Sequence, residues 1–366
     1  MRRKLLLLLS VNLLIALLSN AQVTTSSLTG TIKSAANELL TGASVSAVYL
    51  PAGTTYATTS TQSGRFSIQN MQVGGPYTIT ITFVGQQPST FNDVFLRLGE
   101  PYVLDVNLKS GEAALTEVVV TTTGRNSVLN ANRTGAITNI NTRQLQTLPT
   151  ITRSLNDFIR ITPQASSTST GAIGGGNYRQ NYITVDGSDF NNTFGIGGNL
   201  PANGSPISLD AIGEISVNVT PYDIKQSGFV GSAINAVTRA GTNQFSGSVY
   251  TFWRNEKQQG NEVANSTPFT RQPLNEKTYG FRVGGPIIKN KLFFFINGEK
   301  GNRTQPGQTQ FAATASRPFG SSPEISRPSA GFLDTVSNFL KSKYGYETGP
   351  YQQYDNESEN TRFVAR

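Results

Sequence analysis

Hydrophobic and polar positions alternate in short runs between about Ser27 and Ser110, the pattern of β-strands with one buried face. The clearest run is Tyr77–Phe83, in which Tyr, Ile, Ile and Phe alternate with three threonines. Six similar runs are LTGTIKS, ASVSAVYL, TYATTST, GRFSIQN, STFNDVFL and YVLDVNL, separated by turn signals such as QSG and GGP. Seven short strands in about eighty residues predict a small β-sandwich.

The pattern changes after this region to short helices mixed with strands. Asn141 is placed to cap a helix that continues to Leu148. A second helix begins at Ser154, has apolar residues at i, i+3 and i+4, and is halted by Pro163. The segment Asn181–Val185 then predicts a strand that ends in an Asp-Gly turn.

The last third of the chain returns to strict alternation, in longer runs. Tyr279, Phe281 and Val283 alternate with small or polar residues in KTYGFRVGG, and SGSVYTFWRN and KLFFFINGEK are similar. This is typical of outer-membrane strands with an apolar outer face and a polar inner face, although a soluble β-meander has the same period. Helical spacing over Gly331–Tyr344 predicts a helix in a long external loop, and ENTRFVAR begins another strand.

The N-terminus has the three parts of a secretory signal. MRRK is a positive segment, Leu5–Leu18 is an apolar one, and the small residues SNA precede cleavage between Ala21 and Gln22. The apolar segment is short for a transmembrane anchor, which is the alternative. No cysteine follows the cleavage site, so lipid attachment at a cysteine is excluded, and we expect an exported protein.

Composition removes several classes of function. The chain has no histidine and no cysteine, which excludes Ser-His and Cys-His catalysis and the usual zinc sites. Loss of Arg2, Arg3 and Lys4 with the signal lowers the net charge from +8 to +5, without the basic stripe that nucleic acid requires. We therefore predict neither an enzyme nor a nucleic-acid-binding protein, with no cofactor and no metal.

The sandwich sequence resembles the carboxypeptidase regulatory-like domain. The resemblance rests on the G-T-I opening, the G-A-S-V second strand, and Ser63–Phe66 leading into a Pro-Tyr-Thr-Ile strand. That module is not itself catalytic. The resemblance implies a spacer or docking role, with sugar binding as the alternative.

The following region resembles the plug of a TonB-dependent receptor, and the domain order is closest to the Oar-like branch. Four motifs of that family occur in order: the I-x-V-D-G strand and turn at Ile183–Gly187, a strand at Ile212–Val217, a Pro-Tyr-Asp turn at Pro221–Asp223, and SAINAVTRAG at Ser232–Gly241. The fold class expected is mainly β and multidomain: a seven-stranded β-sandwich, a mixed α+β plug, and the first antiparallel strands of a transmembrane β-barrel.

The predicted domains are a signal peptide (1–21), the sandwich (22–111), a linker with a TonB-box candidate (112–124), the plug (125–241), and the first barrel strands with an external loop (242–366). A closed barrel needs at least about eight strands, so we expect a fragment of a longer protein or a truncated gene product.

The resemblance implies two groups of site residues. A short β-branched segment ahead of the plug is the box that a TonB-type protein captures by strand addition, and here it comprises Glu117, Val118, Val119, Val120 and Thr121. The alternative is that these valines complete a domain sheet. Plug-loop residues expected to face substrate are Asn177, Tyr178, Arg179, Asp186, Asp189, Phe190 and Asn191, although Asn and Asp also favour plain turns.

The function implied is energy-coupled uptake of a large substrate, such as a peptide, glycan or chelate, across the outer membrane. The implied partners are a TonB-type energy-transducing protein, outer-membrane lipid and a surface lipoprotein, with the sandwich and linker in the periplasm. The alternative is a surface or periplasmic protein that binds carbohydrate or peptide without transporting it.

Overall fold

A computed structural model describes residues 24–111, 119–120, 136–150, 152–166, 171–192, 200, 206–219, 231–262, 268, 271–307, 310–352 and 354–366. The predicted signal peptide and its cleavage site, the Pro221–Asp223 turn, and Glu117, Val118 and Thr121 lie outside them. The chain forms two compact units, one of Met1–Gly247, Arg282–Asn297 and Phe363–Arg366, the other of Ser248–Phe281 and Gly298–Arg362. None of the helices described is long and apolar enough to cross a membrane.

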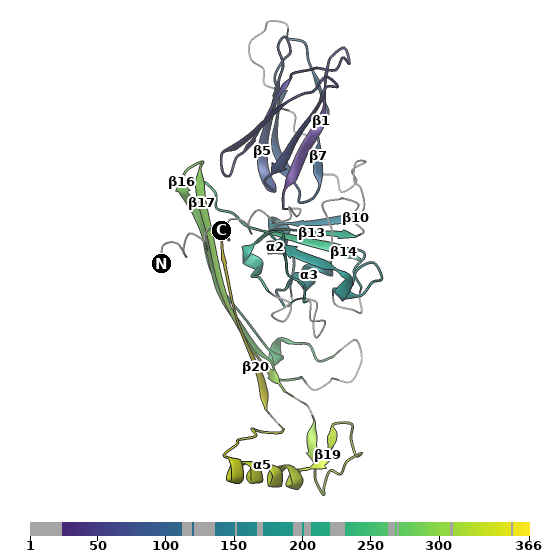
Figure 1. Cartoon of the computed structure of the whole chain (residues 1–366), viewed down its shortest axis with the longest axis vertical. Helices are drawn as coiled ribbons and strands as arrows, with labels where there is room; N and C mark the ends of the chain where they lie inside the picture. The colour runs from purple at the N-terminus through teal and green to yellow at the C-terminus, as the bar shows by residue number, and fades with distance from the viewer. Residues whose placement is uncertain are drawn as a thin grey trace, which may run out of the picture. The chain divides into compact units, whose positions relative to one another are not determined.

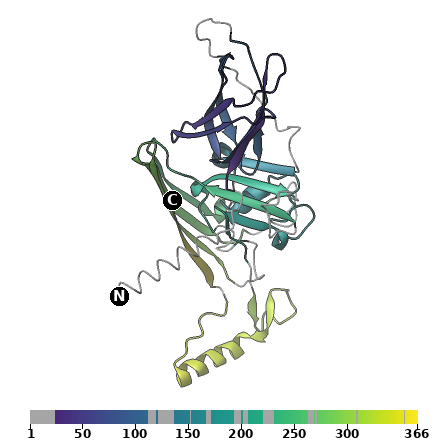
Figure 2. The same cartoon turned by 45° about the horizontal axis from the view of Figure 1, so that its top comes forward.

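The sandwich, purple to blue at the top of Figures 1 and 2, consists of two sheets. The first has the order β4 (Arg65–Met71), β1 (Ser26–Ser34) and β7 (Pro101–Val103), with β8 (Val106–Leu108) also paired to β1. The second has the order β3 (Thr54–Thr59), β2 (Ser44–Tyr49), β5 (Gly74–Thr82), β6 (Ser89–Leu96) and β9 (Val119–Val120). Alternate residues of both sheets, such as Leu28, Val45 and Ile79, fill one shared core.

The structure has eight strands between Ser26 and Leu108, so the predicted number of seven was wrong. The difference lies in YVLDVNL, which forms two strands rather than one. Between them the Leu104 N–H donates to the Thr29 carbonyl oxygen (2.8 Å), and the Asp105 carboxylate accepts from the Thr31 N–H (2.9 Å). Gly30 is required at this crossing, because a Cβ there would lie 1.9 Å from the Leu104 carbonyl oxygen.

The plug sheet contains five strands in the order β10 (Ala136–Asn141), β13 (Ile212–Val219), β14 (Ser232–Thr238), β11 (Tyr182–Val185) and β12 (Ser188–Asp189). β11 and β14 are parallel, and the other neighbours are antiparallel. The central strand β14 is buried along its whole length, which explains its nearly continuous apolar and small-residue sequence.

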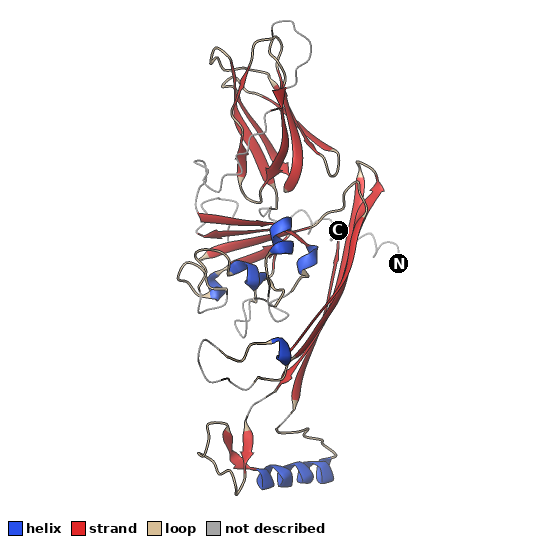
Figure 3. Cartoon of the chain, turned by 180° about the vertical axis from the view of Figure 1, so that it is seen from behind, coloured by secondary structure: helices blue, strands red, loops and turns tan. Residues whose placement is uncertain are grey.

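Two short α-helices lie beside this sheet (Figures 1 and 3). α2 (Thr142–Thr147) has the predicted Asn141 cap, completed by a reciprocal hydrogen bond from the Asn141 N–H to the Gln144 side chain. α3 (Leu155–Ile159) begins after Ser154 and buries Leu155, Phe158 and Ile159 in the plug core. The short 3-10 helices η1 (Tyr178–Gln180) and η2 (Leu209–Ala211) also lie in this region.

Four long strands follow, in the sheet order β15 (Ser246–Asn255), β16 (Asn275–Ile288), β17 (Leu292–Pro306) and β20 (Asp355–Ala365). η3 (Glu256–Gln258) follows β15. Between β17 and β20 lie β18 (Phe311–Ala313), β19 (Ile325–Ser329) and α5 (Ala330–Tyr344), shown in blue at the bottom of Figure 3. The helix predicted at Gly331–Tyr344 is therefore present, whereas β18 and β19 were not predicted.

Candidate functional site

The turn Asp186–Gly187 closes the plug motif through the carboxylate of Asp186. Both residues have positive φ angles, 48° and 82°, as a tight turn between β11 and β12 requires. The Asp186 carboxylate accepts from the Thr238 N–H (2.9 Å) and hydroxyl (2.5 Å) at the end of β14. Arg366 donates to the Thr238 carbonyl oxygen (2.8 Å) and lies 3.7 Å from Asp186. Asp186 therefore anchors the turn between β11 and β12 to the end of β14.

Four other predicted loop residues lie beside the opposite end of β11, around Asn181. The Asn177 side chain caps η1 by accepting from the Arg179 N–H (3.0 Å). The Arg179 guanidinium lies 5.5 Å from the centre of the Tyr178 ring, and its Nε donates to the Tyr178 hydroxyl. Asn191 donates to the Asn181 carbonyl oxygen (2.8 Å), which brings the second loop next to η1.

The remaining two, Asp189 and Phe190, shape the loop itself. Asp189 accepts from the Asn191 N–H (2.8 Å), an Asx-type turn contact, and Phe190 packs half-buried against the plug core. Of the predicted set, Tyr178 and Arg179 present an aromatic ring and a cation at the surface. The structure groups them with Asn177 and Asn191 and places Asp186 apart from them.

Asn181 is the residue in this region that sequence reasoning missed. It is buried, with 3% of its surface exposed, and its side chain links three segments. Its amide group donates to the Gly171 carbonyl oxygen and accepts from the Ser232 hydroxyl (2.8 Å). A single Asn carries no sequence signal of burial, so only the fold identifies it.

The TonB-box candidate is described over Val119 and Val120, which form β9. Its backbone pairs in parallel with β6, with Ser89 opposite Val119 and Thr90 opposite Val120. The box candidate thus joins the second sandwich sheet at its edge, as in the alternative in which these valines complete a domain sheet.

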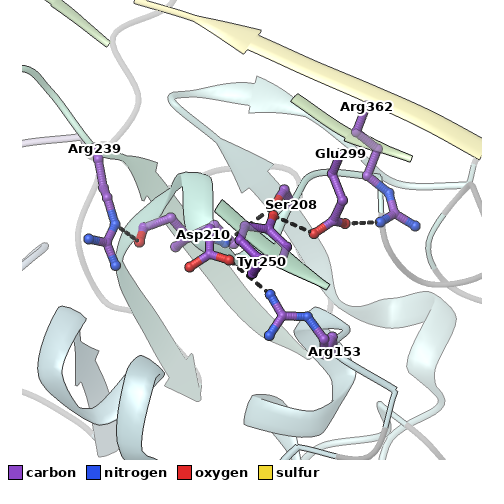
Figure 4. A network of polar contacts seen from close by, with 8 residues as sticks. Arg153, Ser208, Asp210, Arg239, Tyr250, Glu299 and Arg362 are labelled. Carbon is purple, nitrogen blue, oxygen red and sulfur yellow. Dashed lines mark hydrogen bonds and ion pairs between the residues drawn. The ribbon is translucent and has the colours of Figure 1, made fainter. Parts of the chain in front are cut away.

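In the four long strands the apolar face is exposed and the polar face is buried, which is the opposite of a soluble sheet. Phe281, Val283 and Leu292 are exposed, as are Trp253 and Phe363, whereas polar residues of β17 on the other face are buried. On that face Glu299 is 5% exposed and accepts from the Tyr250 hydroxyl (2.7 Å), while Arg362 forms an ion pair with it (Figure 4). This is the pattern of strands whose apolar face meets lipid and whose polar face meets a filled lumen.

Partly buried charges of the plug are held by backbone groups as well as by ion pairs. Arg153 pairs with Asp210 at 3.0 Å (Figure 4). Arg239 donates to the Ile212 carbonyl oxygen (3.1 Å), and burial beside Arg282 lowers its pKa to about 10. Within the described residues, no cluster of acidic side chains is arranged to hold a metal ion.

Comparisons with known proteins agree with these features. Residues 27–109 match the carboxypeptidase regulatory-like domain, and residues 237–357 match an outer membrane beta barrel domain. The TonB-dependent transporter Oar of Myxococcus xanthus is 32% identical over 151 residues, which are 39% of this chain and 14% of Oar. The chain resembles a TonB-dependent transporter. The resemblance to the Oar type predicted from the plug motifs is confirmed.

Solved structures with partial likeness include two receptors. The siderophore receptor PirA of Pseudomonas aeruginosa matches 47% of this chain and 30% of its own chain, with 19% identity and a TM-score of 0.35. PirA of Acinetobacter baumannii matches 47% and 25%, with 22% identity and a TM-score of 0.34. The chain spans 14% of the length of Oar, the curated relative that it matches. Because Oar is a transporter, the prediction that this Oar-like chain is not an enzyme is confirmed.

Proposed function

We propose that this chain forms the sandwich, the plug and the first barrel strands of an outer-membrane receptor for TonB-dependent uptake. The observation that carries the proposal is the reversed polarity of β15, β16, β17 and β20, which directly follow the plug sheet. A sheet with an exposed aromatic face and a buried Glu–Arg pair is unfavourable in water but suits a barrel wall in lipid. The substrate class we propose is a peptide, glycan or chelate too large for simple pores.

The proposed mechanism is mechanical. Substrate binds outside, where the ring of Tyr178 and the cation of Arg179 give the plug surface groups that stack and bind anions. In the periplasm, a TonB-type protein adds a strand to the box ahead of the plug and pulls on it. The contacts that then yield are backbone hydrogen bonds such as the ladder of β10 on β13, which re-form without any covalent step.

The test is capture of the box in cells that express the receptor. The wild-type protein should reside in the outer-membrane fraction and cross-link to the TonB-type protein from a photoreactive residue at position 117. Val119→Pro should remove the cross-link and leave membrane assembly unchanged, because proline lacks the N–H that strand addition uses. Val119→Thr, which keeps a β-branched side chain and the N–H, is the matched control and should cross-link like wild type.

Two results would count against the proposal. Recovery of the wild-type protein in the soluble periplasmic fraction without any cross-link would favour a non-transporting carbohydrate- or peptide-binding protein. Loss of membrane assembly in Val119→Pro, with Val119→Thr normal, would assign the strand to the folding of the sandwich rather than to a partner.

A further inference from the structure

The last strand edge of the sandwich is occupied by the chain's own linker. The segment that leaves the sandwich first runs antiparallel along this edge, with the Gln87 N–H donating to the Lys109 carbonyl oxygen (2.8 Å) and the Gly111 N–H to that of Gly85 (3.1 Å). The chain then returns as β9, which pairs in parallel with β6 next to this contact. The sheet order β3-β2-β5-β6-β9 therefore ends in the box candidate.

The outer edge of β9 is unpaired within the part of the chain that the structure describes. An unpaired edge strand is a template for another strand, because its outward N–H and C=O groups are already aligned. A free linker would have to lose backbone entropy before it could pair with a partner, whereas a segment already held in a sheet has lost part of it.

We propose that the sandwich is a presenting domain: it holds Val119 and Val120 on β6 so that a strand of the TonB-type protein adds to their outer edge. This inference rests on the proposed function and gives the sandwich a role in it. The sheet would then continue from β5 through β6 and β9 into the partner. Among the described residues, two pairs hold β9 on β6, so tension applied by the partner releases the box from β6 more easily than it unfolds the sandwich.

The register of β9 on β6 allows a direct test. Ser89 and Val119 are opposed, and opposed residues of neighbouring strands lie about 5 Å apart, within the range that a disulfide spans. The chain has no cysteine, so Ser89→Cys with Val119→Cys introduces one pair without competitors. The control is Thr59→Cys with Val119→Cys, because β3 lies at the other edge of the same sheet.

The full-length chain in detergent is oxidised, and binding of the purified periplasmic domain of the TonB-type protein is measured before and after reduction. We expect the Ser89–Val119 pair to cross-link and the control pair not to. The oxidised protein should bind the domain about three- to tenfold more tightly than the reduced protein, and at least as tightly, because the disulfide has already ordered the box.

Each other outcome is decisive. If the Ser89–Val119 pair does not cross-link, β9 does not dock on β6 and the inference is wrong. If it cross-links and binding is lost until reduction, the sandwich hides the box rather than presenting it, and the proposed function survives. If neither the reduced variant nor the wild type binds the domain, the proposed function fails and the inference with it.

Discussion

Glu214 offers the sharpest test of how the plug meets the sandwich. It lies on β13, is 6% exposed, and its Oε1 accepts from the Leu98 N–H at 2.8 Å. Burial raises the pKa of Glu214 from an ordinary value of 4.5 to about 7, and the Leu98 hydrogen bond and Arg97 offset only part of that effect. The carboxyl group is therefore protonated in the folded protein well above the pH at which it ionises in the unfolded chain.

The sign of the pH dependence follows from proton binding. Between pH 4.5 and 7 the folded state binds more protons at this group, so the free energy of unfolding falls as pH rises. The contribution is fully present below pH 4.5 and is lost above pH 7. The separation of the two pKa values corresponds to about 3 kcal/mol, at 1.36 kcal/mol for each pH unit.

The perturbation is Glu214→Gln, which keeps an oxygen acceptor for the Leu98 N–H and cannot ionise. At pH 8 the variant should be more stable than wild type by up to about 3 kcal/mol, and near pH 4 the two should be alike. Urea unfolding of the full chain, followed by circular dichroism from pH 4 to 8, measures this difference. Glu38→Gln, at an exposed position of the sandwich, is the control.

The reasoning is refuted if wild-type stability is flat or rises between pH 4.5 and 7 after correction with the Glu38→Gln curve. It is also refuted if Glu214→Gln shows the same fall with pH as wild type. In either case the carboxyl group would be ionised in the folded protein, with water reaching it.

Three further predictions concern the strands and the plug. Glu299→Ala should lower the urea midpoint of the membrane-inserted protein by the equivalent of about 3–5 kcal/mol, because it removes the ion-pair partner of Arg362. Tyr250→Phe removes only a hydrogen bond and should cost about 1 kcal/mol, so equal losses for the two variants would contradict the assigned ion pair. Phe281→Lys on the exposed face should reduce the amount of protein in the outer-membrane fraction, at a cost of about 2–4 kcal/mol, while Thr278→Lys on the opposite face should be tolerated. If Thr278→Lys reduced that amount more than Phe281→Lys, the two faces would be assigned wrongly. Asn181→Ala should speed hydrogen exchange in β14 by the equivalent of about 1–3 kcal/mol, and unchanged exchange would remove its linking role.

Elements with a strict period were predictable from the sequence because the period itself reports a buried face. SGSVYTFWRN was predicted as a strand and coincides with β15, Ser246–Asn255. The Asn141 cap likewise fixed the start of α2, since a capping side chain acts within three residues of the helix start.

Features that depend on contacts between distant segments were not predictable. YVLDVNL has the period of one strand, and its division into β7 and β8 depends on the approach of Leu104 to Gly30, about seventy residues away. The loop residues Asp186 and Asn191 have the same turn-forming chemistry, yet Asp186 anchors β14 and Asn191 lies beside Asn181. Residue type predicts that both residues lie in turns, but it does not predict which group each side chain hydrogen-bonds.

The position of β10 at the edge of the plug sheet has a mechanical consequence for the proposed function. Among the described strands, β10 is the first plug strand after the box, so tension transmitted along the chain reaches it before the other strands described. It is held by one ladder of six residue pairs to β13, and Ile140 is its only buried residue. β14, in contrast, has a neighbour on both sides and is buried throughout. Resistance to tension therefore differs between the strands of the plug. β10 separates from β13 at low force, while the central strands stay paired and provide the template on which β10 re-forms.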